Sequence, residues 1–352
     1  MPYARLRLTF CAFSHFIMDF ACFFALYSGA LKTEQAALFV LLYNFIAFAL
    51  QALAGAFADR IGDNRAMAVM GCGLTALGVM AMGHPLLSVL SLGLGNALFH
   101  VGGAVMSLRD RPGDALFAGV FVAPGALGTA YGLLSAQQGT VTPVYVIFLL
   151  LLCTLLLWGV GPGAPRNAPV KQSKNEPLPL GAGALTLCLG AICVRSFAGF
   201  SADGLGGMAA FVLLGGFASF LGKLLGGALA RKLPWRTVAL LGVGSGGLLM
   251  AFFPQSYVLY LGILLFNLAM PITLAAVTRS LPGHYGLGFG LTTLALFAGT
   301  MPLYALPDGY TAPAPLMAGL TVGCAVLLFL LLRPADSITL KEEPPHEPDP
   351  SA

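Results

Sequence analysis

The sequence predicts an all-α membrane protein with twelve transmembrane helices in two six-helix pseudo-repeats. The chain of 352 residues is 58% hydrophobic and only 9% charged, whereas soluble domains carry about 25% charged residues. Its apolar residues form successive runs of about 20 residues, each long enough to cross a bilayer as a helix. Short alternating segments, which a membrane β-barrel would need, do not dominate. The two halves also carry similar motifs in the same order.

The apolar runs define twelve predicted spans, six on either side of a polar segment. They cover residues 8–30, 35–57, 66–83, 86–108, 115–137, 141–161, 181–201, 206–230, 237–253, 256–279, 286–306 and 313–333. Residues 162–180 are rich in proline and charge and lack an apolar period, which predicts a solvated linker. We therefore expect one bundle over residues 1–161 and a second over residues 181–333. The polar, proline-rich tail at 334–352 is expected to be disordered.

The basic residues predict the orientation in the membrane. If the N-terminus is cytoplasmic, the inner segments hold nearly all of them: Arg5, Arg7, Arg60, Arg65, Arg109, Arg111, Arg166, Lys171, Lys174, Arg231, Lys232, Arg236, Arg279, Arg333 and Lys341. The outer loops hold Lys32 alone, while Arg195 and Lys223 lie within spans. This asymmetry follows the positive-inside rule. It predicts an inner (plasma) membrane protein with both termini, the linker and the tail in the cytoplasm.

The net charge and the cysteines exclude several other roles. The charge of +4 is explained by the cytoplasmic loops, so no nucleic-acid partner is expected. All seven cysteines fall in apolar runs without a C-x-x-C pair or a Cys/His spacing typical of a metal site. We expect small buried thiols, no metal and no cofactor. The expected partners are the lipid bilayer, a small-molecule solute and protons, and the chain is expected to be a monomer.

Two pairs of motifs support the internal repeat. LGGALARKLPWR at 225–236 follows a span as LAGAFADRIGDNR at 53–65 does, and RSLPG at 279–283 matches RDRPG at 109–113. Both matches occur at a shift of about half the chain. Parallel six-span repeats related by an axis along the membrane normal are a recurrent transporter architecture, with the substrate path between the halves.

The stretch GAFADRIGDNR at 55–65 resembles the signature loop between spans two and three of the major facilitator superfamily, roughly G-x-x-x-D-R-x-G followed by basic residues. The resemblance implies that Asp59 contacts the helix beginning near Gly286 and either Arg109 or Arg111. Such a contact is a conformational latch, which holds one state of an alternating-access cycle and breaks in the other.

Each conserved position of that signature has a physical interpretation. Gly55 lets two helices approach closely, and Gly62 permits a tight turn. Arg60 and Arg65 hold the loop on the cytoplasmic side. The sequence departs from the signature at Asp63 and Asn64, which replace the usual basic pair. It also has Arg231 where the repeat would place the counterpart of Asp59, which argues against a symmetrical latch.

A finer resemblance rests on two short segments. SHFIMDF at 14–20 and GNALFHVGG at 95–103 are similar to the fosmidomycin-resistance branch of the superfamily. Members of that branch are efflux transporters for small, often anionic or drug-like compounds. The resemblance implies export of such a compound.

Polar residues inside the spans are the candidate functional residues, because a charge in the hydrocarbon core costs about 2.5–3.5 kcal/mol. His15 and Asp19 are four residues apart and share one helix face, and Asn96 and His100 form a similar stripe. The family resemblance places spans one, four, seven and ten around a central path. We therefore assign proton coupling to Asp19, His15 and His100. A histidine satisfied by polar neighbours, with no proton role, is the alternative for both histidines.

The candidate substrate-binding residues are Arg195, Asn96 and Asn267. An arginine cannot lose its charge, so Arg195 needs an anion, and Asp19 and an anionic substrate are the two candidates. Competition between them would couple protonation to binding, whereas a static Asp–Arg pair would serve structure only. Asn267 is expected first to join helices and second to contact substrate. Lys223 is expected to extend its side chain to the interface.

These observations predict a secondary active transporter, with proton-coupled efflux by antiport as the leading mechanism. The chain has no Walker loop, so an ion or solute gradient must supply the energy, and no enzymatic activity is expected. A membrane-embedded lipid-modifying enzyme is an alternative, although it would need larger loops and more acid/base residues. A receptor or scramblase on a transporter-like fold is a further alternative.

Overall fold

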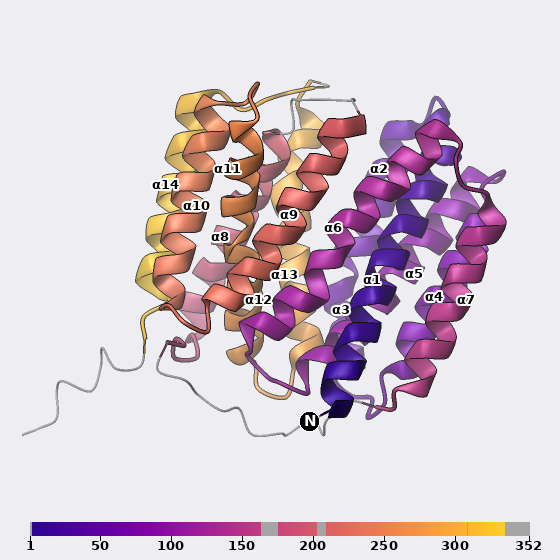
Figure 1. Cartoon of the computed structure of the whole chain (residues 1–352), viewed down its shortest axis with the longest axis horizontal. Helices are drawn as coiled ribbons and strands as arrows, with labels where there is room; N and C mark the ends of the chain where they lie inside the picture. The colour runs from indigo at the N-terminus through magenta and orange to yellow at the C-terminus, as the bar shows by residue number, and fades with distance from the viewer. Residues whose placement is uncertain (1, 163–174, 203–208, 308, 335–352) are drawn as a thin grey trace, which may run out of the picture.

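The computed structural model describes residues 2–162, 175–202, 209–307 and 309–334. In this part of the chain the structure is helical, and the helices form two groups that lie side by side (Figure 1). Most of the predicted linker and all but the first residue of the predicted tail lie outside the described residues, as do Arg166, Lys171, Lys174 and Lys341.

The first group holds seven helical segments. They are α1 (Pro2–Ser28), α2 (Ala36–Asn44), α3 (Gln51–Ala58), α4 (Arg65–Met80), α5 (Pro85–Leu108), α6 (Ala115–Gln138) and α7 (Pro143–Gly159). The second group holds α8 (Ala182–Ser201), α9 (Ala209–Leu229), α10 (Trp235–Phe252), α11 (Val258–Asn267), α12 (Ala269–Arg279), α13 (Tyr285–Thr300) and α14 (Ala314–Leu331).

Two predicted spans are interrupted helices. A π-helical segment, Phe45–Ala49, joins α2 to α3 within the span Ala36–Ala58. The span Val258–Arg279 is interrupted at Leu268, between α11 and α12. The second interruption lies three residues before Pro271, which has no N–H to continue the helical ladder. In membrane helices such breaks are tolerated where neighbouring groups satisfy the freed backbone.

Each of the twelve predicted spans corresponds to a helix or to one of these interrupted pairs. Within the described residues, ten are long and apolar enough to cross a membrane, and α4 and α7 are shorter apolar helices of 16 and 17 residues. Helix ends follow local chemistry. Asp114 caps α6 by accepting from the N–H groups of Leu116 and Phe117, and α6 ends at Gly139 with φ of 62°.

Buried side chains form two hydrophobic clusters. The first draws mainly on α1 to α7 and includes Phe99 and Phe121. The second draws mainly on α8 to α14 and includes Trp235 and Ile272. Each half of the chain therefore packs around its own core, and the two halves meet chiefly along α6 with α9 and along α3 with α13.

The loops that carry most of the cations lie at one end of the molecule, which we call the basic end. It comprises the α3–α4, α5–α6, α9–α10 and α12–α13 loops, and in Figure 1 it lies at the bottom, where α1 begins. The repeat is visible in these loops, since Gly113 (φ 71°) and Gly283 (φ 76°) occupy matching positions with the same left-handed backbone. That conformation favours glycine.

Candidate functional site

A polar cluster lies between α1 and α5. His15 and Asp19 project from α1, and Asn96 and His100 project from α5. His15 Nε2 lies 3.3 Å from Asp19 Oδ2, and His100 Nε2 lies 3.4 Å from Asp19 Oδ1. The two histidine Nε2 atoms lie 2.8 Å apart, and Asn96 Nδ2 donates to Asp19 Oδ1 at 3.3 Å. The structure thus brings together all four polar residues that the sequence singles out in spans one and four.

The other ring nitrogen of each histidine contacts a backbone carbonyl. His15 Nδ1 lies 2.8 Å from Phe121 O on α6, and His100 Nδ1 lies 2.9 Å from Asn96 O. A carbonyl oxygen only accepts, so each Nδ1 must carry the proton. Both rings are therefore fixed with their Nε2 atoms directed at the carboxylate of Asp19.

A glycine of α6 makes room for this cluster. A Cβ atom on Gly125 would overlap both the Asp19 carboxylate and His15 Nε2. The rings of Phe99 and Phe121 pack around His15, with centroids 6.2 and 4.9 Å away. The cluster is largely buried, yet the Asp19 side chain keeps 15% of its surface exposed.

Arg195 is buried in α8, but it does not join this cluster. Among the described residues no hydrogen bond or ion pair links Arg195 to Asp19, and Arg195 Nε has no hydrogen-bond partner. Its electrostatic neighbours include Cys188, Cys324 and Lys223. Of the two anions that the sequence left open for Arg195, the structure does not supply Asp19.

Lys223 is the residue that sequence reasoning misread. We expected its side chain to extend to the membrane interface, but in the structure it interacts electrostatically with both Asp19 and Arg195. The side chain is only partly exposed. The sequence carried no signal for this orientation, which depends on the packing of the α9 backbone at Lys223 against Gly119 of α6, the helix that also borders the Asp19 cluster.

Asn267 lies at the break between α11 and α12. Its Nδ2 donates to Ile263 O at 2.9 Å and to Ser219 Oγ at 3.4 Å. The first contact lies within α11, and the second joins α11 to α9. The structure thus gives Asn267 a helix–helix contact, and its substrate role stays a prediction.

At the basic end, Asp59 contacts the start of α13. Its Oδ1 accepts from the N–H of Gly286 and its Oδ2 from the N–H of Leu287, both at 2.8 Å. The carboxylate is buried and lies at the positive end of the α13 dipole. Close approach is possible because both facing residues are glycines, and a Cβ atom on Gly55 would collide with the backbone of Gly286. The family resemblance implied this contact.

Arg109 supports the same loop. Its side chain is buried and donates to Gly62 O at 3.1 Å and to Ile61 O at 3.3 Å. Arg111 instead lies over the ring of Phe117, 5.8 Å from its centroid. Arg60 is exposed.

The role expected for Gly62 needs correction. Its φ is not positive, and a Cβ atom there would meet open space. The described backbone therefore gives no steric reason for glycine at this turn. The carbonyl of Gly62 matters instead, as an acceptor for Arg109.

Beyond the turn, Arg65 pairs with Asp63. Arg65 Nε donates to Asp63 Oδ2 at 2.8 Å, and its guanidinium lies 5.1 Å from the centroid of the Trp158 ring. The hydrogen bond from Arg65 holds the pKa of the Asp63 carboxyl below its usual value. Asp63, which departs from the family pattern, is therefore a local partner of Arg65 and not a member of the Asp59 contact.

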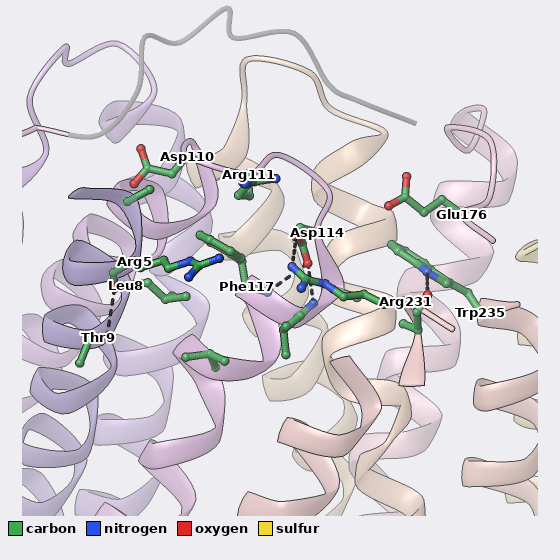
Figure 2. A pocket seen from close by; sticks show the side chains of 15 residues that line it. Arg5, Leu8, Thr9, Asp110, Arg111, Asp114, Phe117, Glu176, Arg231 and Trp235 are labelled. Atoms are coloured by element: carbon green, nitrogen blue, oxygen red, sulfur yellow. Dashed lines mark hydrogen bonds and ion pairs between the residues drawn. The ribbon is translucent and has the colours of Figure 1, made fainter. Parts of the chain in front are cut away.

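The second half has a contact at the corresponding place, with different chemistry. Arg231, which the repeat aligns with Asp59, donates from Nη2 to Asp114 Oδ2 at 2.7 Å (Figure 2). Asp114 is the cap of α6, and α6 corresponds to α13 in the repeat. Gly227, which aligns with Gly55, packs against the backbone of Ala115. A contact joins the halves at both related places, one through a helix terminus and the other through an ion pair.

A cavity of about 800 Å³ lies at the basic end beside these contacts (Figure 2). Its charged lining comprises Arg5, Asp110, Arg111, Asp114, Glu176 and Arg231. Each acid of this lining has a basic partner: Asp110 pairs with Arg7, Asp114 with Arg231 at 2.7 Å and Glu176 with Arg279 at 2.6 Å. The cavity is therefore bordered by three ion pairs that join segments far apart in the sequence.

No protein-family model matches the chain, and no curated protein matches it in sequence. Solved structures match it over nearly its whole length. The E. coli fucose:proton symporter FucP is 14% identical with a TM-score of 0.63, covering 94% of this chain and 97% of that one. The human organic anion transporter MFSD10 (TETRAN) is 18% identical with a TM-score of 0.63, covering 93% and 99%.

A third similar structure is a bacterial homologue of the iron transporter ferroportin in an outward-facing state with soaked iron. It is 14% identical with a TM-score of 0.59, covering 92% of this chain and 98% of that one. FucP has also been solved as a major facilitator superfamily transporter in the outward conformation, with a TM-score of 0.65 to this chain. These similarities and the helices described above confirm the predicted fold class. The chain is a multi-pass membrane protein with the major facilitator fold.

Proposed function

We propose that this protein is a secondary active transporter that moves a small organic solute by alternating access, with proton-coupled efflux as its mode. The observation that carries the proposal is the buried His15–Asp19–His100 cluster, in which two histidines share one carboxylate. Ionisable groups inside a membrane domain are costly, and linked carboxylates and histidines are how transporters relay protons. The fucose:proton symporter among the similar structures supports proton coupling on this fold, although it is a symporter.

Alternating access requires a closure that can break. The Asp59 contact with α13 and the Arg231–Asp114 ion pair join the two halves at the basic end. If the basic end is cytoplasmic, as the positive-inside rule indicates, this conformation is closed toward the cytoplasm. We propose an inner (plasma) membrane location with both termini cytoplasmic, and two bundles over residues 1–161 and 181–333 that move against each other about a cytoplasmic linker.

The solute that we propose is anionic. Arg195 is buried within α8 and its Nε atom has no partner among the described residues. A buried guanidinium is stabilised by a paired anion. Since Asp19 does not supply that charge, a carboxylate or phosphonate group on the solute would. The organic anion transporter MFSD10 has the same fold, and the likeness to the fosmidomycin-resistance branch at residues 14–20 and 95–103 supports export of such a compound.

Proton flux in proteoliposomes tests this proposal. A panel of anionic and drug-like compounds is added to vesicles containing wild type, Asp19→Asn or Asp63→Asn, and internal pH is recorded with a fluorescent dye. We expect at least one compound to drive proton movement in wild type and in Asp63→Asn, which loses a carboxylate outside the cluster. Asp19→Asn should abolish proton movement while solute exchange persists. Normal coupling in Asp19→Asn would refute the assignment of the coupling site.

A further inference from the structure

Three hydrogen-bond acceptors converge in the polar cluster. With Nδ1 of both histidines protonated toward carbonyl oxygens, the Nε2 atoms of His15 and His100 present lone pairs. They lie 2.8 Å from each other and 3.3 and 3.4 Å from the carboxylate oxygens of Asp19. Lone pairs at such distances repel each other unless something positive lies between them. The cluster therefore calls for a shared proton or a cation.

We propose that His15 Nε2, His100 Nε2 and the Asp19 carboxylate bind a single divalent transition-metal cation. Nitrogen and oxygen ligands bind such ions at about 2.0–2.2 Å. Ligands around one ion in tetrahedral or octahedral geometry are then about 2.8–3.6 Å apart. The separations are 2.8 Å between the two Nε2 atoms, 3.3 Å from His15 Nε2 to Asp19 Oδ2 and 3.4 Å from His100 Nε2 to Asp19 Oδ1. All fall within this range, and one ligand atom from each residue lies within 4.8 Å of the others, so a cation fits after movement of the side chains.

The identity of the ligands defines the class of metal. Two imidazoles and one carboxylate suit Fe²⁺, Co²⁺, Zn²⁺ and similar ions, whereas Mg²⁺ and Ca²⁺ prefer oxygen ligands alone. The sequence analysis placed these three residues around one central path but predicted no metal, because His15 and Asp19 make only an i, i+4 pair and His100 is in a different helix. It emerges only when α1 and α5 pack together.

The surroundings of the histidines match those of metal-binding histidines. Such a residue almost always donates its second ring N–H to a carbonyl or carboxylate, which fixes the ring and its tautomer. Here Phe121 O and Asn96 O accept from Nδ1 of His15 and His100. Asn96 adds a possible fourth ligand, because its Oδ1 is buried without a partner among the described residues and its amide already contacts Asp19. Rotation of that amide would direct the oxygen at the cation.

This metal site goes beyond the transport function proposed above, since the three ligands could bind a cation whether or not the protein transports a solute. It also bears on that function, because a metal cation and a shared proton would occupy the same lone pairs. The positive charge of Lys223, which interacts electrostatically with Asp19, would repel a cation bound there. No ion pair within 4.0 Å joins Lys223 to Asp19 among the described residues, so the carboxylate is not already neutralised by direct contact.

Binding of Co²⁺ tests the site. The full chain is purified without a polyhistidine tag, placed in lipid nanodiscs and stripped of metal with a chelator. Co²⁺ is then titrated while visible absorption is recorded, and bound metal is counted by mass spectrometry after gel filtration. We expect one Co²⁺ per chain, with d–d bands typical of nitrogen and oxygen ligands, and competition by Zn²⁺ but not by Mg²⁺.

Four variants locate the bound ion. His15→Gln, His100→Gln and Asp19→Asn should each weaken Co²⁺ binding by 100-fold or more, whereas His84→Gln, which alters an exposed histidine, should bind as wild type does. Gel-filtration profiles and melting temperatures show whether each variant folds. A folded wild type without saturable Co²⁺ binding, or saturable binding that the three cluster variants leave unchanged, would overturn the proposal.

The outcomes separate this site from the transport proposal. Proton flux measured in chelator-treated vesicles reports on transport alone, and Co²⁺ binding in nanodiscs reports on the metal site alone. Proton coupling without Co²⁺ binding would remove the metal site and leave the transporter. Co²⁺ binding without solute-driven proton flux would support the metal site and remove the transport proposal.

Discussion

At the scale of single residues, the sequence predicts contacts within one helix of the candidate site but not contacts between helices. The pairing of His15 with Asp19 follows from their i, i+4 spacing. The contact of His15 with His100 depends on how α1 packs against α5. Arg195 shows the limit of matching charges by sequence, because Asp19 was one of its two candidate anions and the cation that interacts electrostatically with Asp19 is Lys223 instead.

Gly125 provides a test at this scale. In Gly125→Ala the new Cβ atom would overlap Asp19 and His15. Overpacking of this kind typically destabilises the fold by about 1–3 kcal/mol. We expect a lower melting temperature together with loss of Co²⁺ binding and of proton coupling. Gly73→Ala is the matched control, because a Cβ atom on that helical glycine meets open space, and alanine there should stabilise α4 by up to about 1 kcal/mol. Intact Co²⁺ binding in Gly125→Ala would show that the cluster does not need its present spacing.

At the scale of elements, hydropathy predicted the helices well and their interruptions poorly. All twelve apolar runs became helices because length and apolarity alone suffice to define a span. The π-helical segment Phe45–Ala49 and the break at Leu268 depend on local backbone hydrogen bonding, for which Pro271 was the only sequence signal. Lys223 was misread for a related reason. Hydropathy places a lysine in a span, but only the packing of α9 against α6 decides whether its side chain reaches solvent or the Asp19 cluster.

The position of Lys223 on α9 leads to a prediction about the metal site. Its positive charge interacts with Asp19 and therefore opposes any cation bound there. At the effective dielectric of a protein interior, removing one nearby charge is worth on the order of a tenfold change in affinity. We expect Lys223→Met to bind Co²⁺ roughly tenfold more tightly than wild type in the nanodisc titration. Lys232→Met, at an exposed loop position, should leave the affinity unchanged. Weaker binding in Lys223→Met would mean that Lys223 orients Asp19 and does not repel the ion.

At the scale of the whole molecule, the internal repeat explains how the basic end closes. The motif matches at 53–65 and 225–236 predicted related loops, and the structure gives each a contact to the other half. The sequence argued against a symmetrical latch because Arg231 replaces the expected acid. That argument considered residue 231 alone and missed its partner Asp114, the acid that caps α6, where the cap of α13 is His284. The places of contact are symmetrical although their chemistry is not.

The two contacts should differ in strength, and this difference is a prediction for the whole molecule. Asp59 is buried and accepts two backbone N–H groups, and hydrogen bonds to a charged group are worth about 1.5–3 kcal/mol each. The Arg231 side chain is 49% exposed, and exposed ion pairs contribute about 0–1 kcal/mol. If both contacts stabilise the same closed state, Asp59→Asn should shift the balance toward the open state by at least tenfold, and Arg231→Ala by less than about fivefold.

Distances between spin labels measure this balance. Labels carried by noncanonical amino acids replace Arg60 and Lys232, which are exposed in loops of opposite halves at the basic end. Pulsed electron paramagnetic resonance in nanodiscs then gives the fraction of molecules in which the two labels are far apart, as expected for the open state. Asp63→Asn is the control for loss of a loop carboxylate, and we expect it to match wild type because its partner Arg65, two residues away at the start of α4, lies in the same half of the chain. The double variant, which combines Asp59→Asn with Arg231→Ala, should populate the open state most, since the free energies of two independent contacts add. Equal opening in Arg231→Ala and Asp59→Asn would show that burial at the α13 terminus does not set the strength of closure, because the two contacts would then contribute equally.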